Sequence, residues 1–207
     1  NTNTVVGTGA FANNTDGSSN VAVGIQAMRD NQTGGSNTAI GRYSGQLNVD
    51  GNENTYVGNN SGRDNVSGIR NTAVGSSTLV SNTARENSAI GWGALANVTT
   101  GSVNTAVGDS ALNTLTEGSE NQAFGNASLT GVTTGSSNTA VGRSAGSTMT
   151  TGSNNTCIGY QSQPSAPDVS NEVTIGNDDV SKTRLKGNVD VNESAIQLNE
   201  SGDGGQV

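Results

Sequence analysis

The sequence contains no histidine and one cysteine, Cys157, among its 207 residues. Without histidine, Ser-His-Asp and Cys-His catalytic arrangements are excluded, as are metal sites that use histidine. A single cysteine cannot form an internal disulfide, so the fold does not depend on a disulfide framework. Cys157 occupies a repeat position that is usually alanine. This position predicts a small buried packing residue rather than a reactive thiol.

Large apolar side chains and basic side chains are also scarce. Only 30% of the residues are hydrophobic and 3% are aromatic, which is too little for a compact globular core. Nine basic residues stand against 17 acidic ones, giving a net charge of -8. Because phosphate binding needs clustered Lys and Arg, nucleic acid is not a predicted partner. No apolar run is long enough for a membrane span or a signal peptide, so membrane insertion is not predicted.

The chain is instead rich in one repeated pentapeptide, Asn-Thr-Ala-Val-Gly. It stands intact at residues 71–75, 104–108 and 138–142, and with Ile in place of Val at residues 37–41. Its last glycine, which we name the anchor glycine, recurs every 17 residues with one interval of 16. Such a period identifies a stacked repeat architecture and removes the expectation of disorder. The anchor glycines are Gly7, Gly24, Gly41, Gly58, Gly75, Gly91, Gly108, Gly125, Gly142, Gly159 and Gly176.

The three residues before each anchor glycine predict a short strand. The residue directly before the anchor is always large and apolar, the one before it is usually small, and the third is most often Thr. This alternation gives a strand with two distinct faces, and β-branched residues suit its pleat. We predict that the large apolar residues fill the core of the coil or pack chains together in a trimer. They are Val23, Ile40, Val57, Val74, Ile90, Val107, Phe124, Val141, Ile158 and Ile175.

Between the strands, the chain carries turn chemistry. Asn precedes the anchor by four residues in ten of the eleven repeats, and Gly precedes it by seven in eight. Both residues tolerate positive φ, and Asn can bond to nearby backbone. The shortened interval lies within 79–87, where we predict a trimmed turn with the strand register preserved. The turn and ladder residues singled out are Asn37, Asn71, Asn104, Asn138, Gly41, Gly75, Gly108 and Gly142.

Four residues after the anchor stands either a large apolar residue, such as Leu112, or a glycine: Gly45, Gly62 or Gly146. Where glycine replaces the large residue, a neighbouring coil or chain must fill the space, or the backbone must approach closely.

Together these patterns predict an all-β fold, a parallel β-solenoid (β-roll) of about 17-residue coils over residues 1–176. Residues 177–207 are expected to form a β connector or stalk with a flexible tail, because residues 183–191 alternate polar and apolar side chains. Each coil offers roughly two large apolar side chains against the entropy of about 17 ordered residues, so we expect partner subunits, with three chains around a common axis. The chain begins inside a repeat, and we expect it to be a segment of something longer.

The strand sequences at residues 20–24, 104–108 and 173–176 resemble the head repeats of YadA-like trimeric autotransporter adhesins. The longer units Thr100–Gly108 and Thr134–Gly142 resemble repeats of bacteriophage tail fibres and other virion fibres. The resemblance implies an extracellular, trimeric β-roll that belongs to a virion or a cell surface. It implies three kinds of partner: further copies of the chain, other fibre or virion proteins, and a host-surface glycan or protein.

The function expected from the sequence is therefore a structural fibre segment of a phage or viral tail fibre that mediates host attachment. One alternative is the head of a bacterial trimeric adhesin, and a minor alternative is an ice-binding solenoid presenting its Thr column. No catalytic residue, cofactor or metal is predicted, and the pairs Asp178–Asp179 and Glu117 with Glu120 are interpreted as solvated charge. Exposed recognition residues are expected after the anchors. They are Arg42, Tyr43, Trp92 and Tyr160.

Overall fold

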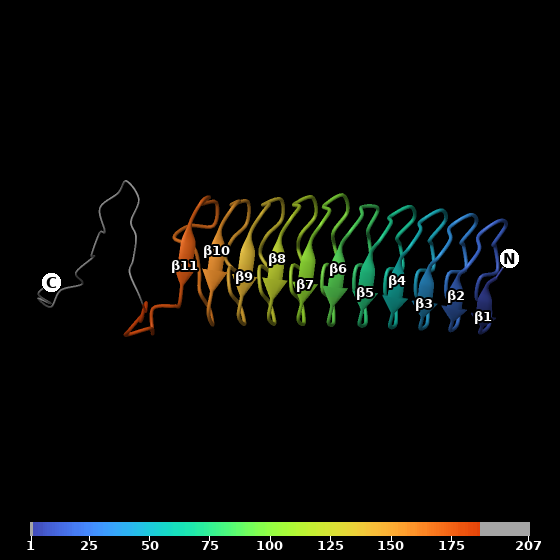
Figure 1. Cartoon of the computed structure of the whole chain (residues 1–207), viewed down its shortest axis with the longest axis horizontal. Helices are drawn as coiled ribbons and strands as arrows, with labels where there is room; N and C mark the ends of the chain where they lie inside the picture. Colours follow the sequence, from blue (N-terminus) through green and yellow to red (C-terminus); the bar gives the residue numbers. More distant parts are fainter. Residues whose placement is uncertain (1, 187–207) are drawn as a thin grey trace, which may run out of the picture. The chain divides into compact units, whose positions relative to one another are not determined.

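A computed structural model describes residues 2–186. Residues within this range form eleven short strands and no helix, and all strands belong to one parallel sheet in sequence order (Figure 1). Each strand has three residues and ends directly before an anchor glycine. The strands are β1 (Thr4–Val6), β2 (Val21–Val23), β3 (Thr38–Ile40), β4 (Thr55–Val57), β5 (Thr72–Val74), β6 (Ser88–Ile90), β7 (Thr105–Val107), β8 (Gln122–Phe124), β9 (Thr139–Val141), β10 (Thr156–Ile158) and β11 (Val173–Ile175). The predicted parallel β-solenoid is confirmed.

Successive strands pair in a constant register. Thr38 pairs with Thr55 and Ile40 with Val57, so equivalent repeat positions stack on one another. The shortened interval keeps this register, since Thr72 still pairs with Ser88. The missing residue lies in the turn that contains Ala84, where eight other coils have glycine and the last has Val169. The predicted trimmed turn is therefore confirmed, and the shorter repeat leaves the strand pairing unchanged.

The inside of each coil is lined by the alanine of the pentapeptide. Ala39, Ala73 and Ala106 are fully buried, whereas Ile40 is 42% exposed and Ile90 is 45% exposed. The prediction that the Val and Ile column fills the core of the coil is therefore wrong. Alternate strand residues point to opposite faces, so the Ala column and the Val/Ile column cannot both face inward.

The wall opposite the alanines supplies the bulk of the core. Met28, Leu79, Leu95, Leu112 and Leu129 are fully buried, and all lie four residues after an anchor glycine. This wall leaves room only for a small side chain on the strand. Large residues inside and alanine on the strand are thus two halves of one packing arrangement, repeated at about 4.8 Å per coil.

In some coils, glycine stands in this wall four residues after the anchor in place of the large residue. A strand beside it then carries a larger residue at the alanine position. Tyr56 takes the alanine position, and its ring fills the space beside Gly45 and Gly62, where a Cβ atom would come within 2.7 and 2.3 Å of the ring. Likewise Cys157 replaces alanine near Gly146 and is 1% exposed. The predicted filling by a neighbouring coil is confirmed, as is the interpretation of Cys157 as a buried packing residue.

The anchor glycines hold a backbone conformation that other residues rarely adopt. Gly108 has φ of 139°, and a Cβ atom there would lie 2.4 Å from the carbonyl oxygen of Gly125. The anchor is glycine in every coil because the backbones of successive coils touch at this corner.

The chain divides into two compact units, Asn1–Asn177 and Asp178–Val207. In the second unit, residues 178–186 contain no strand. The strand predicted for residues 183–191 is absent from 183–186, and its remainder, like the predicted flexible tail, lies outside the described residues.

Candidate functional site

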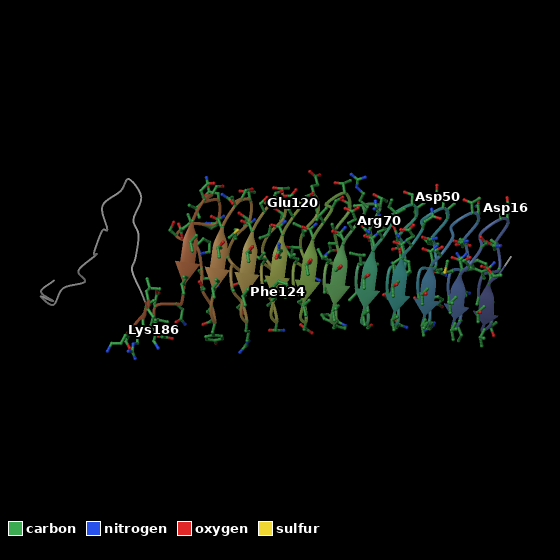
Figure 2. The ribbon with its side chains drawn as sticks, in the orientation of Figure 1. Asp16, Asp50, Arg70, Glu120, Phe124 and Lys186 are labelled. Carbon is green, nitrogen blue, oxygen red and sulfur yellow. The ribbon has the colours of Figure 1, made fainter. Side chains whose placement is uncertain are left out.

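The outer face of the sheet carries a continuous row of apolar side chains, which we name the apolar ladder. Because equivalent strand positions stack in register, the large residue before each anchor lies beside its counterpart in the next coil. Seven of these side chains are exposed and the other four are half-buried. The ladder consists of Val6, Val23, Ile40, Val57, Val74, Ile90, Val107, Phe124, Val141, Ile158 and Ile175. Figure 2 labels Phe124 at the lower end of β8.

The apolar ladder is the strongest candidate for an interface. Isolated exposed apolar residues are common on monomers, but a long contiguous apolar stripe indicates a surface that is covered in the assembled protein. The Thr column lies two residues before the ladder on the same outer face, so the two columns flank an inward alanine.

The asparagine four residues before each anchor belongs to the interior and not to a binding surface. Asn104 Oδ1 accepts a hydrogen bond of 2.9 Å from the backbone N–H of Asn121, and its Nδ2 donates to the Gly118 carbonyl at 3.0 Å. Asn37, Asn71 and Asn138 make the same kind of contact with the next coil. These asparagines form a ladder that joins coils, rather than bonding to their own turn, and no ligand can reach them.

The four predicted recognition residues lie in the turn that follows the strands. Arg42, Trp92 and Tyr160 occupy the first position after an anchor, and Tyr43 occupies the second. The Trp92 side chain is 59% exposed and that of Tyr160 is 52% exposed. The Arg42 guanidinium lies 4.4 Å from the centre of the Tyr43 ring and donates a 2.9 Å hydrogen bond to the Tyr43 hydroxyl.

These residues form a row along the solenoid rather than one patch. We name the first positions after the anchors the aromatic turn row. Arg42 and Trp92 are three coils apart, or about 14 Å, and Trp92 and Tyr160 are four coils apart, or about 19 Å. Sequence analysis missed Arg143, whose guanidinium lies 5.8 Å from the centre of the Tyr160 ring. The signal was available, because Arg143 and Tyr160 hold the same position in consecutive repeats.

The turn that precedes each strand carries more acidic residues than the aromatic turn row, which follows the strands. Figure 2 shows Asp16, Asp50, Arg70 and Glu120 along this edge. Two arginines, Arg70 and Arg85, offset only part of its negative charge, and Arg70 pairs with Glu86 at 2.9 Å. The acidic residues of this acidic turn row are Asp16, Asp50, Glu53, Glu86, Glu117, Glu120 and Asp168.

Cys157 and Glu172 are two titratable groups near the C-terminal end of the solenoid with shifted pKa values. Burial raises the pKa of the Cys157 thiol, so the reactive thiolate is disfavoured. Hydrogen bonds from Ser165 lower the pKa of Glu172 and keep it ionised. No group of three potential ligands among His, Cys, Asp and Glu is gathered within residues 2–186. Glu117 and Glu120 both lie exposed in the acidic turn row.

Comparisons with known protein families, with curated proteins and with solved structures found no match. Within the described part of the chain, no helix has the length and apolar character needed to cross a membrane.

Proposed function

We propose that this chain is a segment of a homotrimeric, extracellular virion fibre that attaches a phage or virus to its host cell. The apolar ladder is the observation that carries the proposal. Completing the burial of these seven exposed and four half-buried side chains contributes on the order of 1 kcal/mol each, enough to hold chains together along their length.

A second copy of the chain is the partner that fits this ladder best. The ladder repeats every coil, at about 4.8 Å, over ten intervals. A partner must match that pitch over the whole row, and another copy of the same solenoid does so without mismatch. Cyclic closure then gives a closed assembly in which every ladder is covered. The number three comes from the resemblance to trimeric fibres and adhesin heads.

Analytical ultracentrifugation tests the assembly. We expect the wild-type chain to sediment as a trimer and the double variant Ile90→Asp with Val107→Asp to sediment as a folded monomer, because both side chains point away from the coil interior. The control is Thr100→Asp, which adds charge at an exposed turn position and leaves the trimer intact. A wild-type chain that is folded and monomeric contradicts the proposal.

Attachment is tested by binding of the fluorescently labelled trimer to host cells. We expect saturable binding that blocks infection by the parent virion. In a bacterial trimeric adhesin, the same ladder would serve the same assembly, and a neighbouring coiled coil and outer-membrane barrel in place of virion modules would identify that alternative.

One observation favours a second candidate, an ice-binding solenoid. Thr38 and Ile40 both face outward beside the inward Ala39, which gives two parallel outer columns at regular spacing. Ser88 and Gln122 interrupt the Thr column, and Phe124 interrupts the flatness of its neighbour. Thermal hysteresis in a nanolitre osmometer tests this candidate directly, and its absence excludes it.

A further inference from the structure

We infer that the aromatic turn row binds an extended acidic polysaccharide with widely spaced charges. This inference rests on the proposed function, since it names the chemical class of the host-surface partner. The row consists of Thr8, Ile25, Arg42, Asn59, Ser76, Trp92, Asp109, Asn126, Arg143, Tyr160 and Asn177.

The backbone of the row is fixed before any ligand arrives. The N–H of each second turn residue donates to the carbonyl of the first turn residue in the preceding coil: Ser110 to Trp92 at 2.8 Å, and Gln161 to Arg143 at 2.9 Å. The side chains therefore project from a regular scaffold, so little ordering entropy opposes binding.

The aromatic residues of the row are open platforms. Trp92 lies between Ser76 and Asp109 in the row and is followed by Gly93, so no bulky neighbour covers its ring. Tyr160 carries Arg143 near its ring, which combines a flat surface with a positive charge. A flat ring with one wet edge offers an apolar surface to the face of a sugar ring, and a planar guanidinium group binds carboxylates bidentately.

The spacing favours an extended ligand over a folded protein. Hot spots of protein interfaces cluster near the centre of one patch, whereas Trp92 stands about 14 Å from Arg42 and about 19 Å from Tyr160, with polar residues between. A polysaccharide that runs along the solenoid reaches all of these positions, and its hydroxyl groups pair with the intervening Asn59, Ser76 and Asn126.

Charge selects among extended ligands. The row holds two arginines, Arg42 and Arg143, and one carboxylate, Asp109, which accepts hydrogen bonds from Ser110 at 3.0 Å and Asn126 at 3.1 Å. The row is thus the positive edge of a chain whose net charge is -8. A densely charged nucleic acid is repelled by the acidic remainder, whereas a polysaccharide with sparse carboxylates can place them at Arg42 and Arg143 and pass Asp109 with an uncharged unit.

Trp92 is the only tryptophan in the chain, so its fluorescence reports on the row directly. The assembled protein is first applied to a panel of immobilised hyaluronan, xanthan, alginate, dextran, pullulan and single-stranded DNA. We expect retention on at least one acidic polysaccharide and none on the neutral ones. Titration with fragments of the retained polysaccharide should shift and quench the Trp92 emission, and long fragments should bind more tightly than short ones.

Variants then locate the site. Arg143→Ser combined with Tyr160→Ser, and Arg42→Ser alone, should each weaken binding roughly tenfold at low salt, and added salt should weaken wild-type binding. Arg85→Ser removes an exposed arginine from the acidic turn row and should leave the affinity unchanged, which makes it the matched control. Because Trp92→Ser lacks the fluorescent reporter, its binding is compared with that of the wild-type protein by retention on the panel.

Failure of all acidic polysaccharides to bind overturns the inference, as does equal retention of dextran, preferential retention of DNA, or wild-type affinity in the row variants. The host-cell assay separates this inference from the proposed function. If the row variants are trimeric and still attach to host cells, the inference fails and attachment stands. If the wild-type protein attaches to no host cell, attachment fails, and the panel still decides the inference.

Discussion

The coils before and after the short repeat interval share one outer design and differ inside. In the early coils, the position seven residues after the anchor is asparagine; these residues are Asn14, Asn31, Asn48, Asn65 and Asn82. In the later coils, it is apolar and fully buried; these residues are Val98, Leu115, Val132 and Met149. The change coincides with the 16-residue interval, so the trimmed turn separates a polar interior column from an apolar one.

The two columns hold the same turn by different physics. In the early coils, Asn31 Nδ2 donates to the Gly34 carbonyl at 3.0 Å, and Asn48 Nδ2 donates to Asn31 Oδ1 at 2.7 Å. In the later coils, the Gly118 carbonyl has only the Asn104 donor, and Leu115 contributes by burial. Hydrogen bonds require alignment and so specify register, whereas apolar burial is non-directional and contributes mainly free energy.

The largest expected effect concerns Tyr56, whose buried ring is part of the core of the early coils. Tyr56→Ala should lower the free energy of unfolding by about 4 kcal/mol, because it opens a cavity beside Gly45 and Gly62 and removes one of the two acceptors of Asn65 Nδ2. Hydrogen exchange resolved by mass spectrometry should place the loss in the early coils, with the later coils protected as before.

The matched control restores the usual packing. Tyr56→Ala combined with Gly45→Leu and Gly62→Leu should recover most of the stability, since φ is 56° and 58° at these glycines and 51° at Leu112. A triple variant no more stable than the single one contradicts this packing scheme.

The next effect comes from exchanging the interior columns. Leu115→Asn should cost about 3 kcal/mol, because the new amide finds no asparagine neighbour between Val98 and Val132. Urea unfolding followed by circular dichroism measures the change.

The reverse exchange, Asn48→Leu, should cost less, about 1–2 kcal/mol, mainly because Asn31 Oδ1 loses its donor. Asn48 Oδ1 has no hydrogen-bond partner in the described part of the chain, and the Gly51 carbonyl keeps the Asn37 donor at 2.7 Å. Equal costs for the two exchanges would show that the halves do not differ in the way described.

Alkaline pH should affect the two halves in sequence. Burial, with a contribution from Glu172, raises the pKa of Cys157, and burial also raises the pKa of Tyr56. A raised folded pKa gives stability that is full below the unfolded pKa and is lost as pH rises toward the folded value. The stability contributed by Cys157 in the later coils should therefore begin to fall above about pH 8.5, and that contributed by Tyr56 in the early coils above about pH 10. Each fall should reach up to about 1.4 kcal/mol per pH unit.

Hydrogen exchange at stepped pH, corrected for the intrinsic exchange rate, measures this order. Cys157→Ala should remove the first loss and Tyr56→Phe the second. If both halves of the wild-type chain lose protection from exchange at the same pH, the early and later coils do not respond independently, and this prediction is wrong.

The smallest expected effect is on the outer surface. Arg29 with Asp30, and Arg63 with Asp64, form ion pairs at 2.5 and 2.6 Å in the early coils, with partly exposed side chains. Arg63→Ala should change the free energy of unfolding by less than about 0.5 kcal/mol, since solvent screens such pairs. A larger change in thermal unfolding would mean that the early coils depend on their surface as well as on the asparagine column.

The sequence was sufficient to predict the period, the parallel coils, the preserved register at residues 79–87 and the burial of Cys157. It did not show which face of the strand points inward, because alternation is symmetric: Ala39 and Ile40 fit either side. The deciding signal is compensation. The largest residue in the alanine column, Tyr56, lies between two repeats that have glycine four residues after the anchor, Gly45 and Gly62. Large residues in one column matched by small ones in the other indicate columns that face each other.

The candidate site was less predictable for a different reason. The expected residues Arg42, Tyr43, Trp92 and Tyr160 were chosen by exposure, but Arg143 joins them only through stacking across a coil. Proximity along the solenoid links residues 17 positions apart, and local motifs cannot reveal it.

The constant register has one more consequence, for the length of the molecule. Nearly every contact of a coil is made to the coil before it or after it, so removing residues 105–121 joins Asn104 to Gln122 and brings Ser88 opposite Gln122 with the sheet unbroken. Whole coils can then be lost or duplicated by recombination between near-identical repeats without leaving buried polar groups unpaired. Evolution can therefore change the length of such a molecule one coil at a time.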